Sequence, residues 1–355
     1  MDLRIGVMGF GGMGHYHAEH VKVPGVTFVT ACDIEAVQLA DAEALGVKAY
    51  LNDEEGFFND GSINTVLLTV PNHLHKEYAV KAAAAGKNVI CEKPAALLPA
   101  DFDAMVQAAW ERGVLFEVHQ NRRWDRDFCI VKKIYDEKRI GEIFNIESNI
   151  HMPSGRVQGW HQFKEYGGGM VYDWGVHCID QALQLIPDKV GTVFADLKNV
   201  FHTEVDDYYK IIIKFRGGQT VNLNLCTYVL KPYPRWFVCG DRGTAEILSF
   251  AGDGKLYKTS RVLEKLPPRI EPNVAGPTRS YIPVPPGELL EEDLPAVPEA
   301  AETAWLEFYR NYRAVLNGKE SFKIKNEEVR RVLELMQAVF QSAETGMAVR
   351  FDYDD

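Results

Sequence analysis

An aspartate and a histidine four positions apart, Asp173 and His177, follow three consecutive glycines, Gly167-Gly168-Gly169. On a helix, residues at this spacing lie on one face and within reach of each other. A histidine beside a carboxylate is suited to accept a proton, because the acid can fix the tautomer of the imidazole and raise its basicity. Glycines before the pair let a ligand approach the backbone closely. The stretch predicts a proton-handling site, against the alternative of an ordinary surface pair.

Lys93 is the second residue placed where chemistry can occur. It belongs to Glu92-Lys93-Pro94, which follows the apolar run at residues 88–91. Open α/β sheets bind ligands outside the carboxyl ends of their strands. Pro94 also biases Lys93 towards an extended backbone. We therefore expect the Lys93 amine at the ligand crevice, although the tripeptide alone is also compatible with a surface turn.

A glycine-rich turn lies near the N-terminus. The six residues Gly9, Phe10, Gly11, Gly12, Met13 and Gly14 fit the G-x-G-x-x-G pattern between a strand-like run and a helix-like segment. In that context the glycines allow a tight turn, close approach of a pyrophosphate and close packing of helix on strand. The pattern predicts a dinucleotide site.

The choice of dinucleotide depends on Asp33, nineteen positions after Gly14. An acidic residue at the end of the second strand is expected to hydrogen-bond a ribose 2′-hydroxyl, and its charge repels a 2′-phosphate. The next residue is Ile34, not an arginine that could hold a phosphate. We predict NAD as cofactor, with NADP less favoured.

Residues after the third and fourth main strands are expected to complete this site. We predict that Pro71, Asn72, His75, Glu92 and Lys93 contact the cofactor, with Asn72 and His75 bordering the nicotinamide side. For His75, a plain position on a helix surface is an equally open alternative.

The elements that position these residues fall into two groups. Strand-like runs at residues 3–8, 26–32, 63–70, 88–91 and 114–118 alternate with helical patterns. Such alternation predicts βαβ units and a doubly wound parallel sheet, here an NAD-binding Rossmann domain over residues 1–122.

The second group, residues 123–355, predicts an α/β domain with an open, mostly antiparallel sheet. A helical stretch at 126–138 precedes period-two segments at 143–151, 208–215 and 219–228. Residues 253–302 are rich in Pro and Gly and predict a surface excursion. Helices are expected at 301–316 and 327–343, the second ending at Gly346.

The composition of the chain limits the classes of partner that it is expected to bind. The chain has 355 residues, of which 46% are hydrophobic, and a formal net charge of −11. This charge disfavours nucleic acid and anionic membrane surfaces. The six cysteines include no Cys-x-x-Cys pair, and no signal or membrane-spanning run is evident, so we expect buried free thiols and a cytoplasmic location. His15, His17 and His20 lack a matching set of ligands, and we predict no metal.

Together these motifs resemble the glucose-fructose oxidoreductase/inositol dehydrogenase/MocA (Gfo/Idh/MocA) family. The resemblance implies an NAD(P)-dependent oxidoreductase that interconverts a secondary alcohol and a ketone of a sugar or cyclitol. It further implies that Lys93 hydrogen-bonds the reacting oxygen, His177 exchanges its proton and Asp173 orients substrate and histidine. Family members often join subunits through the open sheet, so a homo-oligomer is expected.

The substrate is expected to be a carbohydrate or cyclitol. Aromatic side chains near the glycine-rich motif, including Trp160 and Tyr166, suit the apolar faces of sugar rings, although each alone is compatible with interface packing. Arg122 and His151 are further candidates for substrate binding, with interdomain salt bridges as the alternative for Arg122 and Arg123. Other readings are a reductase or dehydrogenase of a non-sugar carbonyl, or a non-catalytic NAD-binding regulatory protein.

Overall fold

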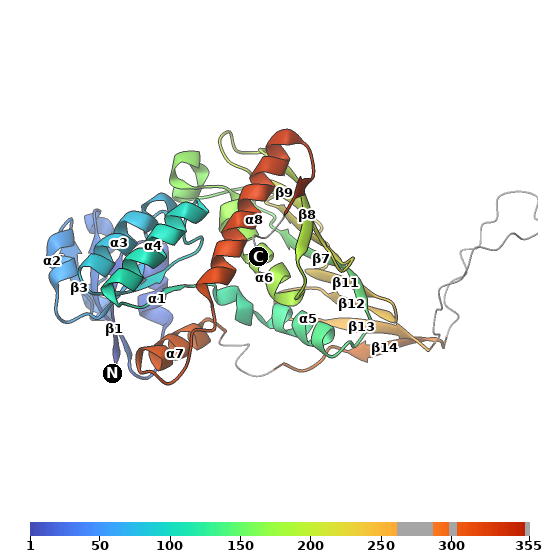
Figure 1. Cartoon of the computed structure of the whole chain (residues 1–355), viewed down its shortest axis with the longest axis horizontal. Coiled ribbons are helices and arrows are strands. Elements are labelled where there is room, and N and C mark those ends of the chain that lie inside the picture. The colour runs from blue at the N-terminus through green and yellow to red at the C-terminus, as the bar shows by residue number, and fades with distance from the viewer. Residues whose placement is uncertain (261–286, 298–303, 352–355) are drawn as a thin grey trace, which may run out of the picture.

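The computed structural model describes residues 1–260, 287–297 and 304–351. Within them the chain forms two sheets side by side, each with its own helices (Figure 1). The predicted combination of a doubly wound parallel sheet and a second, mostly antiparallel sheet is confirmed.

The first sheet has six parallel strands in the order β3-β2-β1-β4-β5-β6. Its strands are β1 (Leu3–Met8), β2 (Val26–Asp33), β3 (Lys48–Leu51), β4 (Thr65–Leu68), β5 (Asn88–Cys91) and β6 (Phe116–Val118), and its crossover helices include α1 (Gly12–His20), α2 (Glu54–Asn59), α3 (His75–Ala84) and α4 (Pro99–Arg112). Because helices cover the sheet, its central strands are almost continuously apolar and buried, as in β4. The strand order reverses between β1 and β4, which is where such sheets bind dinucleotides.

The second sheet has nine strands in the order β14-β13-β12-β11-β7-β10-β9-β8-β15. They are β7 (Ile143–His151), β8 (Val190–Lys198), β9 (Tyr208–Phe215), β10 (Thr220–Cys226), β11 (Trp236–Gly240), β12 (Gly243–Ile247), β13 (Gly254–Thr259), β14 (Leu289–Asp293) and β15 (Val349–Arg350). The ladder is antiparallel except between β7 and β10. Three of these strands, β7, β9 and β10, match the predicted period-two segments.

Helices cover one face of the second sheet. They are α5 (Arg126–Asp136), α6 (Val176–Leu185) and α8 (Asn326–Thr345), and they lie on the side towards the first sheet (Figure 1). Since β8 and β10 both run antiparallel to β9, β8 is parallel to β7, and α6 is the crossover helix between them. The unit of β7, α6 and β8 is therefore a crossover between parallel strands, like the βαβ units of the first sheet.

The prediction of a surface excursion over residues 253–302 is wrong at two places. β13 and β14 pair antiparallel at the edge of the second sheet, and Lys255 lies opposite Asp293 with an ion pair of 2.8 Å. Both strands are short and largely polar, so their alternation is weak in the sequence, and the pairing between them is not local. Residues 261–286 and 298–302 of that segment lie outside the described residues.

The two C-terminal helices are confirmed where they are described. α7 (Ala304–Leu316) packs on the first sheet although it comes late in the chain, and the Tyr312 hydroxyl donates to the Val89 carbonyl oxygen at 3.3 Å. α8 ends at Gly346, which has a left-handed φ of 67° as predicted for a C-terminal cap. The domain boundary at residue 122 stays a prediction. By its contacts, α7 belongs to the first domain.

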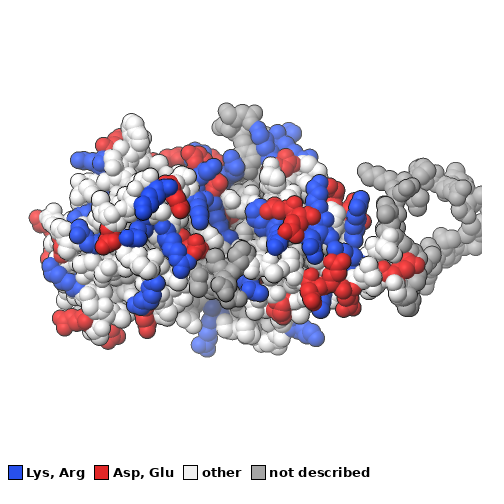
Figure 2. Space-filling view, turned by 90° about the horizontal axis from the view of Figure 1, so that it is seen from below, with Lys and Arg blue, Asp and Glu red and all other residues white. Residues whose placement is uncertain are grey.

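Acidic and basic side chains are interspersed on the face of the molecule seen in Figure 2. All six cysteines are free, as predicted, but Cys129, Cys226 and Cys239 are only partly buried. Among the described helices, none combines the length and the apolar character needed to cross a membrane.

Candidate active site

The glycine loop between β1 and α1 has the geometry of a dinucleotide cradle. Gly9 has a φ of +88°, and a Cβ there would lie 2.8 Å from the Val70 nitrogen. A Cβ on Gly14 would lie 2.6 Å from the Gly9 carbonyl oxygen, so both positions exclude larger residues. A Cβ on Gly11 or Gly12 would meet no other described atom within 4 Å. The middle of the loop is thus open to a ligand at the N-terminus of α1.

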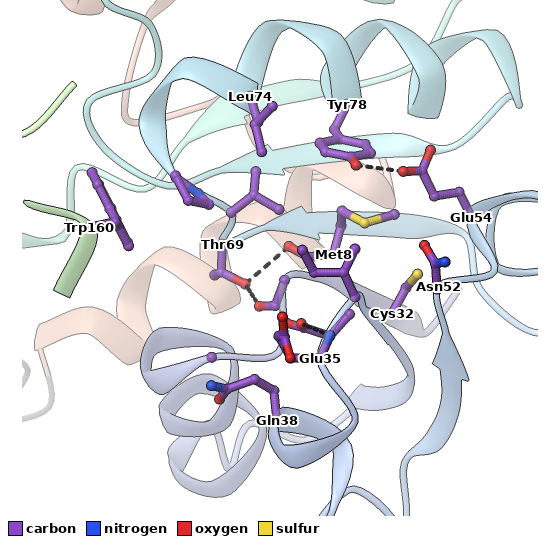
Figure 3. A pocket seen from close by; sticks show the side chains of 16 residues that line it. Met8, Cys32, Glu35, Gln38, Asn52, Glu54, Thr69, Leu74, Tyr78 and Trp160 are labelled. Carbon is purple, nitrogen blue, oxygen red and sulfur yellow. Dashed lines mark hydrogen bonds between the residues drawn. The ribbon is translucent and has the colours of Figure 1, made fainter. Parts of the chain in front are cut away.

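A cavity of about 350 Å³ borders this loop (Figure 3). Asp33 lies in its wall, where one carboxylate oxygen accepts the Phe10 N–H at 2.7 Å and the other accepts the Glu35 N–H at 2.9 Å. Ile34, also in the wall, is 70% exposed. The charged side chains that line the cavity are Asp33, Glu35 and Glu54, all of them acidic. Negative charge therefore surrounds the place expected for the adenosine ribose.

A second cavity, of about 510 Å³, adjoins the first. The two share part of their lining, namely Gly11, Gln38, Thr69, Val70 and Trp160. Lys93 and Asp173 line the second cavity. Trp160, which follows β7, stands at the end of the first cavity opposite Tyr78 and Glu54 (Figure 3). A continuous groove thus runs from Asp33 to Lys93, as an extended dinucleotide requires.

Lys93 and Asp173 form an ion pair across the second cavity. The Lys93 Nζ lies 2.8 Å from the Asp173 Oδ1 and 3.0 Å from the Asp173 carbonyl oxygen. Burial acts to raise the pKa of Asp173, but the Lys93 ammonium outweighs it and holds that pKa below the usual value. Asp173 belongs to a π-helical turn, Val171–Gly175, just before α6. Such turns are rare and recur at functional sites.

His177 lies one helical turn further on and is 4% exposed. Its pKa lies well below the usual value because of burial and then because of the positive charges of Lys93 and Arg122. The imidazole is therefore neutral near pH 7 and able to accept a proton. Its Nδ1 has no hydrogen-bond partner among the described residues, and Asp173 gives its carboxylate to Lys93 instead. Asp173 was predicted to orient His177, but the described residues show no direct hydrogen bond between the two side chains.

His161 is one of the aromatic and histidine residues near the glycine-rich motif, but it was not assigned to the site from the sequence. It lines the second cavity beside Trp160, and the two rings stack with centroids 3.8 Å apart. Burial lowers the pKa of His161, whereas the nearby Asp173 carboxylate acts to raise it. Its position in an irregular segment gave no periodic signal. Thr69 and Gln38, which line both cavities, were also not predicted. Thr69 directly follows β4, within the strand predicted at 63–70, and Gln38 lies in a short 3-10 helix, Ala36–Leu39.

Asn72 and His75 lie in the wall of the second cavity, as expected for the nicotinamide side. Asn72 donates its side-chain N–H to the Gly167 carbonyl oxygen at 2.8 Å and so ties the two halves of the site together. His75 is 1% exposed, with ring nitrogens 2.9 Å from the Pro94 oxygen and 3.0 Å from the Val70 oxygen. The alternative that His75 is a surface residue is wrong.

Besides His177, which lines neither cavity, three predicted substrate residues lie outside both cavities. Arg122 stacks on Trp174 at 4.2 Å and pairs with Asp125 at 2.8 Å. Tyr166 stacks on His73.

His151, the third of them, lines a separate cavity together with Glu147, Lys210 and Asn224. The last three alternate with buried core residues, so this cavity opens on the sheet face away from the helices. The structure does not bring His151 to Lys93. Of the neighbouring arginines, Arg123 forms salt bridges with Asp180 and Glu328, each at 2.6 Å. All three residues belong to the predicted second domain, so these salt bridges are not the interdomain ones that were expected.

His17, Glu92 and His119 form a buried cluster of potential metal ligands. The Glu92 Oε1 lies 2.8 Å from the His17 Nε2 and 2.7 Å from the His119 Nδ1. Two ligand atoms on one tetrahedral zinc ion would be about 3.3 Å apart. The separations are those of hydrogen bonds, and the cluster is accounted for without an ion.

Two family models cover most of the chain. Residues 3–120 match the oxidoreductase family with an NAD-binding Rossmann fold, and residues 128–246 match the GFO/IDH/MocA C-terminal domain. The chain belongs to the Gfo/Idh/MocA family of oxidoreductases. This family membership confirms the predicted resemblance and assigns dinucleotide binding to the first domain.

Individual known proteins are similar to different shares of the chain. The crystal structure of an NAD-binding protein from Listeria innocua is 34% identical, with a TM-score of 0.86 over 99% of this chain and 97% of that one. The scyllo-inositol 2-dehydrogenase (NADP(+)) IolW of Bacillus subtilis is 31% identical, and the match spans 62% of this chain and 64% of IolW. An inositol 2-dehydrogenase of Salmonella typhimurium is 29% identical over 71% of this chain and 75% of its own.

Proposed function

We propose that the protein is an NAD-dependent dehydrogenase that oxidises a secondary alcohol of a cyclitol, sugar or glycoside, or reduces the corresponding ketone. The observation that carries this proposal is the Lys93–Asp173 pair, which lines a cavity continuous with the dinucleotide groove. The nicotinamide, which donates or accepts the hydride, and the substrate oxygen can therefore meet in one cavity. The inositol dehydrogenases among the relatives support a cyclitol as substrate class.

Each residue has a definite task in this reaction. Bound nicotinamide supplies the hydride acceptor. The Lys93 ammonium donates a hydrogen bond to the reacting oxygen and stabilises the negative charge that develops there. Neutral His177 takes the hydroxyl proton, and Asp173 positions Lys93 and accepts a hydrogen bond from a substrate hydroxyl.

NAD is proposed over NADP because of the charges around the ribose site. Asp33, Glu35 and Glu54 line the first cavity, whose described lining includes no lysine or arginine. A 2′-phosphate carries two negative charges at most and would meet repulsion from Asp33 and Glu35, whereas the charge of Glu54 is offset by Lys81 at 2.7 Å. The relative IolW is named for NADP(+), so the preference of this protein has to be measured.

We also propose that subunits associate through the face of the second sheet that carries no described helix. Phe194 and Phe237 alternate with buried residues of β8 and β11, and they are 36% and 38% exposed on that face. Light scattering of the wild type and of a Phe194→Lys, Phe237→Lys variant tests this assembly. A monomeric wild type contradicts it.

The first experiment mixes purified protein with myo-inositol, scyllo-inositol, common sugars and methyl glycosides, each with NAD or NADP, and follows nicotinamide absorbance. A rise with NAD and a cyclic alcohol supports the proposal and names the substrate class. Turnover of small aldehydes, ketones or imines alone would indicate a non-sugar carbonyl. Binding of NAD without any turnover would indicate a regulatory protein.

A further inference from the structure

Glu92 is the centre of a buried hydrogen-bond network directly behind Lys93. Its Oε1 is bonded to the His17 Nε2 and the His119 Nδ1, and its Oε2 accepts the backbone N–H of Lys93 at 3.2 Å. His17 is fully buried, His119 is 1% exposed and Glu92 is 6% exposed. Three donors thus converge on one carboxylate that lines the second cavity.

The network continues to α7, a helix from the far end of the chain. The Tyr309 hydroxyl lies 2.8 Å from the His17 Nδ1, and Tyr309 is fully buried. The roles of the atoms follow from their chemistry. An ionised carboxylate only accepts hydrogen bonds, so the His17 Nε2 must carry the proton. The Nδ1 of the neutral ring is then an acceptor, and the Tyr309 hydroxyl must donate to it.

The aromatic face of α7 closes this network off from water. Trp305, Phe308, Tyr309 and Tyr312 recur at helical spacing. Phe308 meets the edge of the His119 ring at 4.6 Å, and Trp305 meets His17 at 5.7 Å. Hydrogen bonds in such a dry place are strong, and a lost partner is costly.

We propose that Tyr309 and His17 are positioning residues for Lys93 and that they act through Glu92. Tyr309 sets the tautomer of His17, His17 and His119 hold the Glu92 carboxylate, and that carboxylate holds the backbone of Lys93. On the other side of Lys93, His75 contacts the Pro94 carbonyl oxygen at 2.9 Å, so the lysine is held on both flanks. α7 thereby contributes to the reaction without touching the cavity. The kinetic part of this proposal rests on the proposed dehydrogenase function.

Tyr309→Phe and Tyr312→Phe form a matched pair of variants. Both tyrosines are fully buried on α7, and each loses one hydroxyl, but the Tyr312 hydroxyl donates to the Val89 carbonyl oxygen and not to the Glu92 network. Their melting temperatures should therefore fall to a similar extent. Only Tyr309→Phe should lower kcat, by about tenfold with the KM for NAD unchanged, because a misplaced reacting group costs up to ~10²-fold. His17→Gln should match it, and the double variant should be no worse than His17→Gln alone because the residues act in series.

A readout that needs no substrate separates this inference from the proposed function. Pyridoxal 5′-phosphate followed by borohydride labels lysines, and peptide mass spectrometry gives the rate at Lys93, with exposed Lys76 as internal reference. Tyr309→Phe should change the Lys93 rate relative to Lys76, and Tyr312→Phe should not. Equal Lys93 rates in wild type and Tyr309→Phe, or equal changes in both variants, would overturn the proposal. A stoichiometric metal ion in purified protein would also overturn it. If no alcohol is oxidised, the dehydrogenase proposal fails while the labelling still decides the network.

Discussion

Lys93 and Asp173 join the two halves of the molecule by an ion pair of 2.8 Å, with side chains 18% and 25% exposed. One residue follows a strand of the first sheet, and the other precedes a helix of the second. In the proposed reaction, a substrate oxygen that enters the cavity would find the lysine already oriented by the acid. The pair is therefore part of a preorganised site, and it provides the most direct test of the proposed reaction.

Lys93→Met should lower kcat by about 10²–10⁴, because it removes the donor that stabilises charge on the reacting oxygen. Turnover of the best alcohol found in the substrate panel is the measurement, and NADH binding by fluorescence shows whether the groove is intact. Lys76→Met, in an exposed ion pair with Asp101, is the matched control and should leave turnover unchanged. Unchanged turnover in Lys93→Met would remove Lys93 from the mechanism.

The pH dependence of alcohol oxidation should show an acidic limb below pH 6.5. The pKa of His177 lies well below its ordinary value of 6.5, first because of burial and then because of Lys93 and Arg122. The neutral, proton-accepting ring therefore persists as the pH falls through 6.5, and activity is lost only lower. The measurement is kcat/KM against pH for the wild type, for His177→Gln and for His20→Gln, a half-exposed control. A wild-type limb at or above pH 6.5 that His177→Gln abolishes would contradict the expectation.

Ile34→Arg should shift the cofactor preference towards NADP. Ile34 is 70% exposed in the wall of the first cavity, so an arginine fits there at little cost in stability. A charge-assisted hydrogen bond to the 2′-phosphate should tighten NADP binding by about tenfold. Dissociation constants for NADH and NADPH by fluorescence titration provide the check, with Val37→Arg as an exposed control outside that lining. If the wild type already binds NADPH more tightly than NADH, the proposed role of Asp33 is wrong.

Asp206 should make the protein less stable as the pH rises from about 4 to about 6. Burial raises the pKa of Asp206 from 3.8 to about 6, although its bond from the Val171 N–H acts against this. Between these values the folded state binds more protons than the unfolded state, so the free energy of unfolding falls with pH, by at most about 3 kcal/mol.

Urea unfolding of the wild type and of Asp206→Asn at several pH values measures this effect of Asp206. The variant should lose the decrease between pH 4 and 6 and should be the more stable protein above pH 6. Asp196→Asn, in an exposed pair with Lys198, should behave as the wild type. Identical pH profiles for Asp206→Asn and wild type would show that Asp206 does not cause the decrease in stability.

The parts of the site that are local in sequence could be predicted. The turn from β1 into α1, the tripeptide after β5 and the Asp173–His177 stretch each carry their chemistry within a few residues. Buried strands such as β4 and β5 were evident because helices on both faces make them apolar along their length.

The long-range parts of the site could not be predicted. Tyr309 meets His17 across 292 positions of sequence, and His17 meets Glu92 across 75. Nothing in the pattern near His17 distinguishes a network partner from its neighbours His15 and His20. Trp160 was a predicted site residue, but the direction of its side chain and that of His161 could not be predicted, because both lie in an irregular segment without periodicity. The strands β13 and β14 are recognisable only from their pairing with each other and not from the sequence of either strand.

The parallel relation of β7 and β8 has a consequence for how this protein can change over evolutionary time. Trp160, His161, Asp173 and His177 all belong to the single connection between those two strands, and the glycine loop and Lys93 belong to connections of the other sheet. Under the proposed function, connections of the first sheet carry the nicotinamide site and Lys93, and the connection between β7 and β8 carries the other site residues. We therefore expect that residues 152–189 can diverge between relatives while the first sheet and both sheet registers stay as they are.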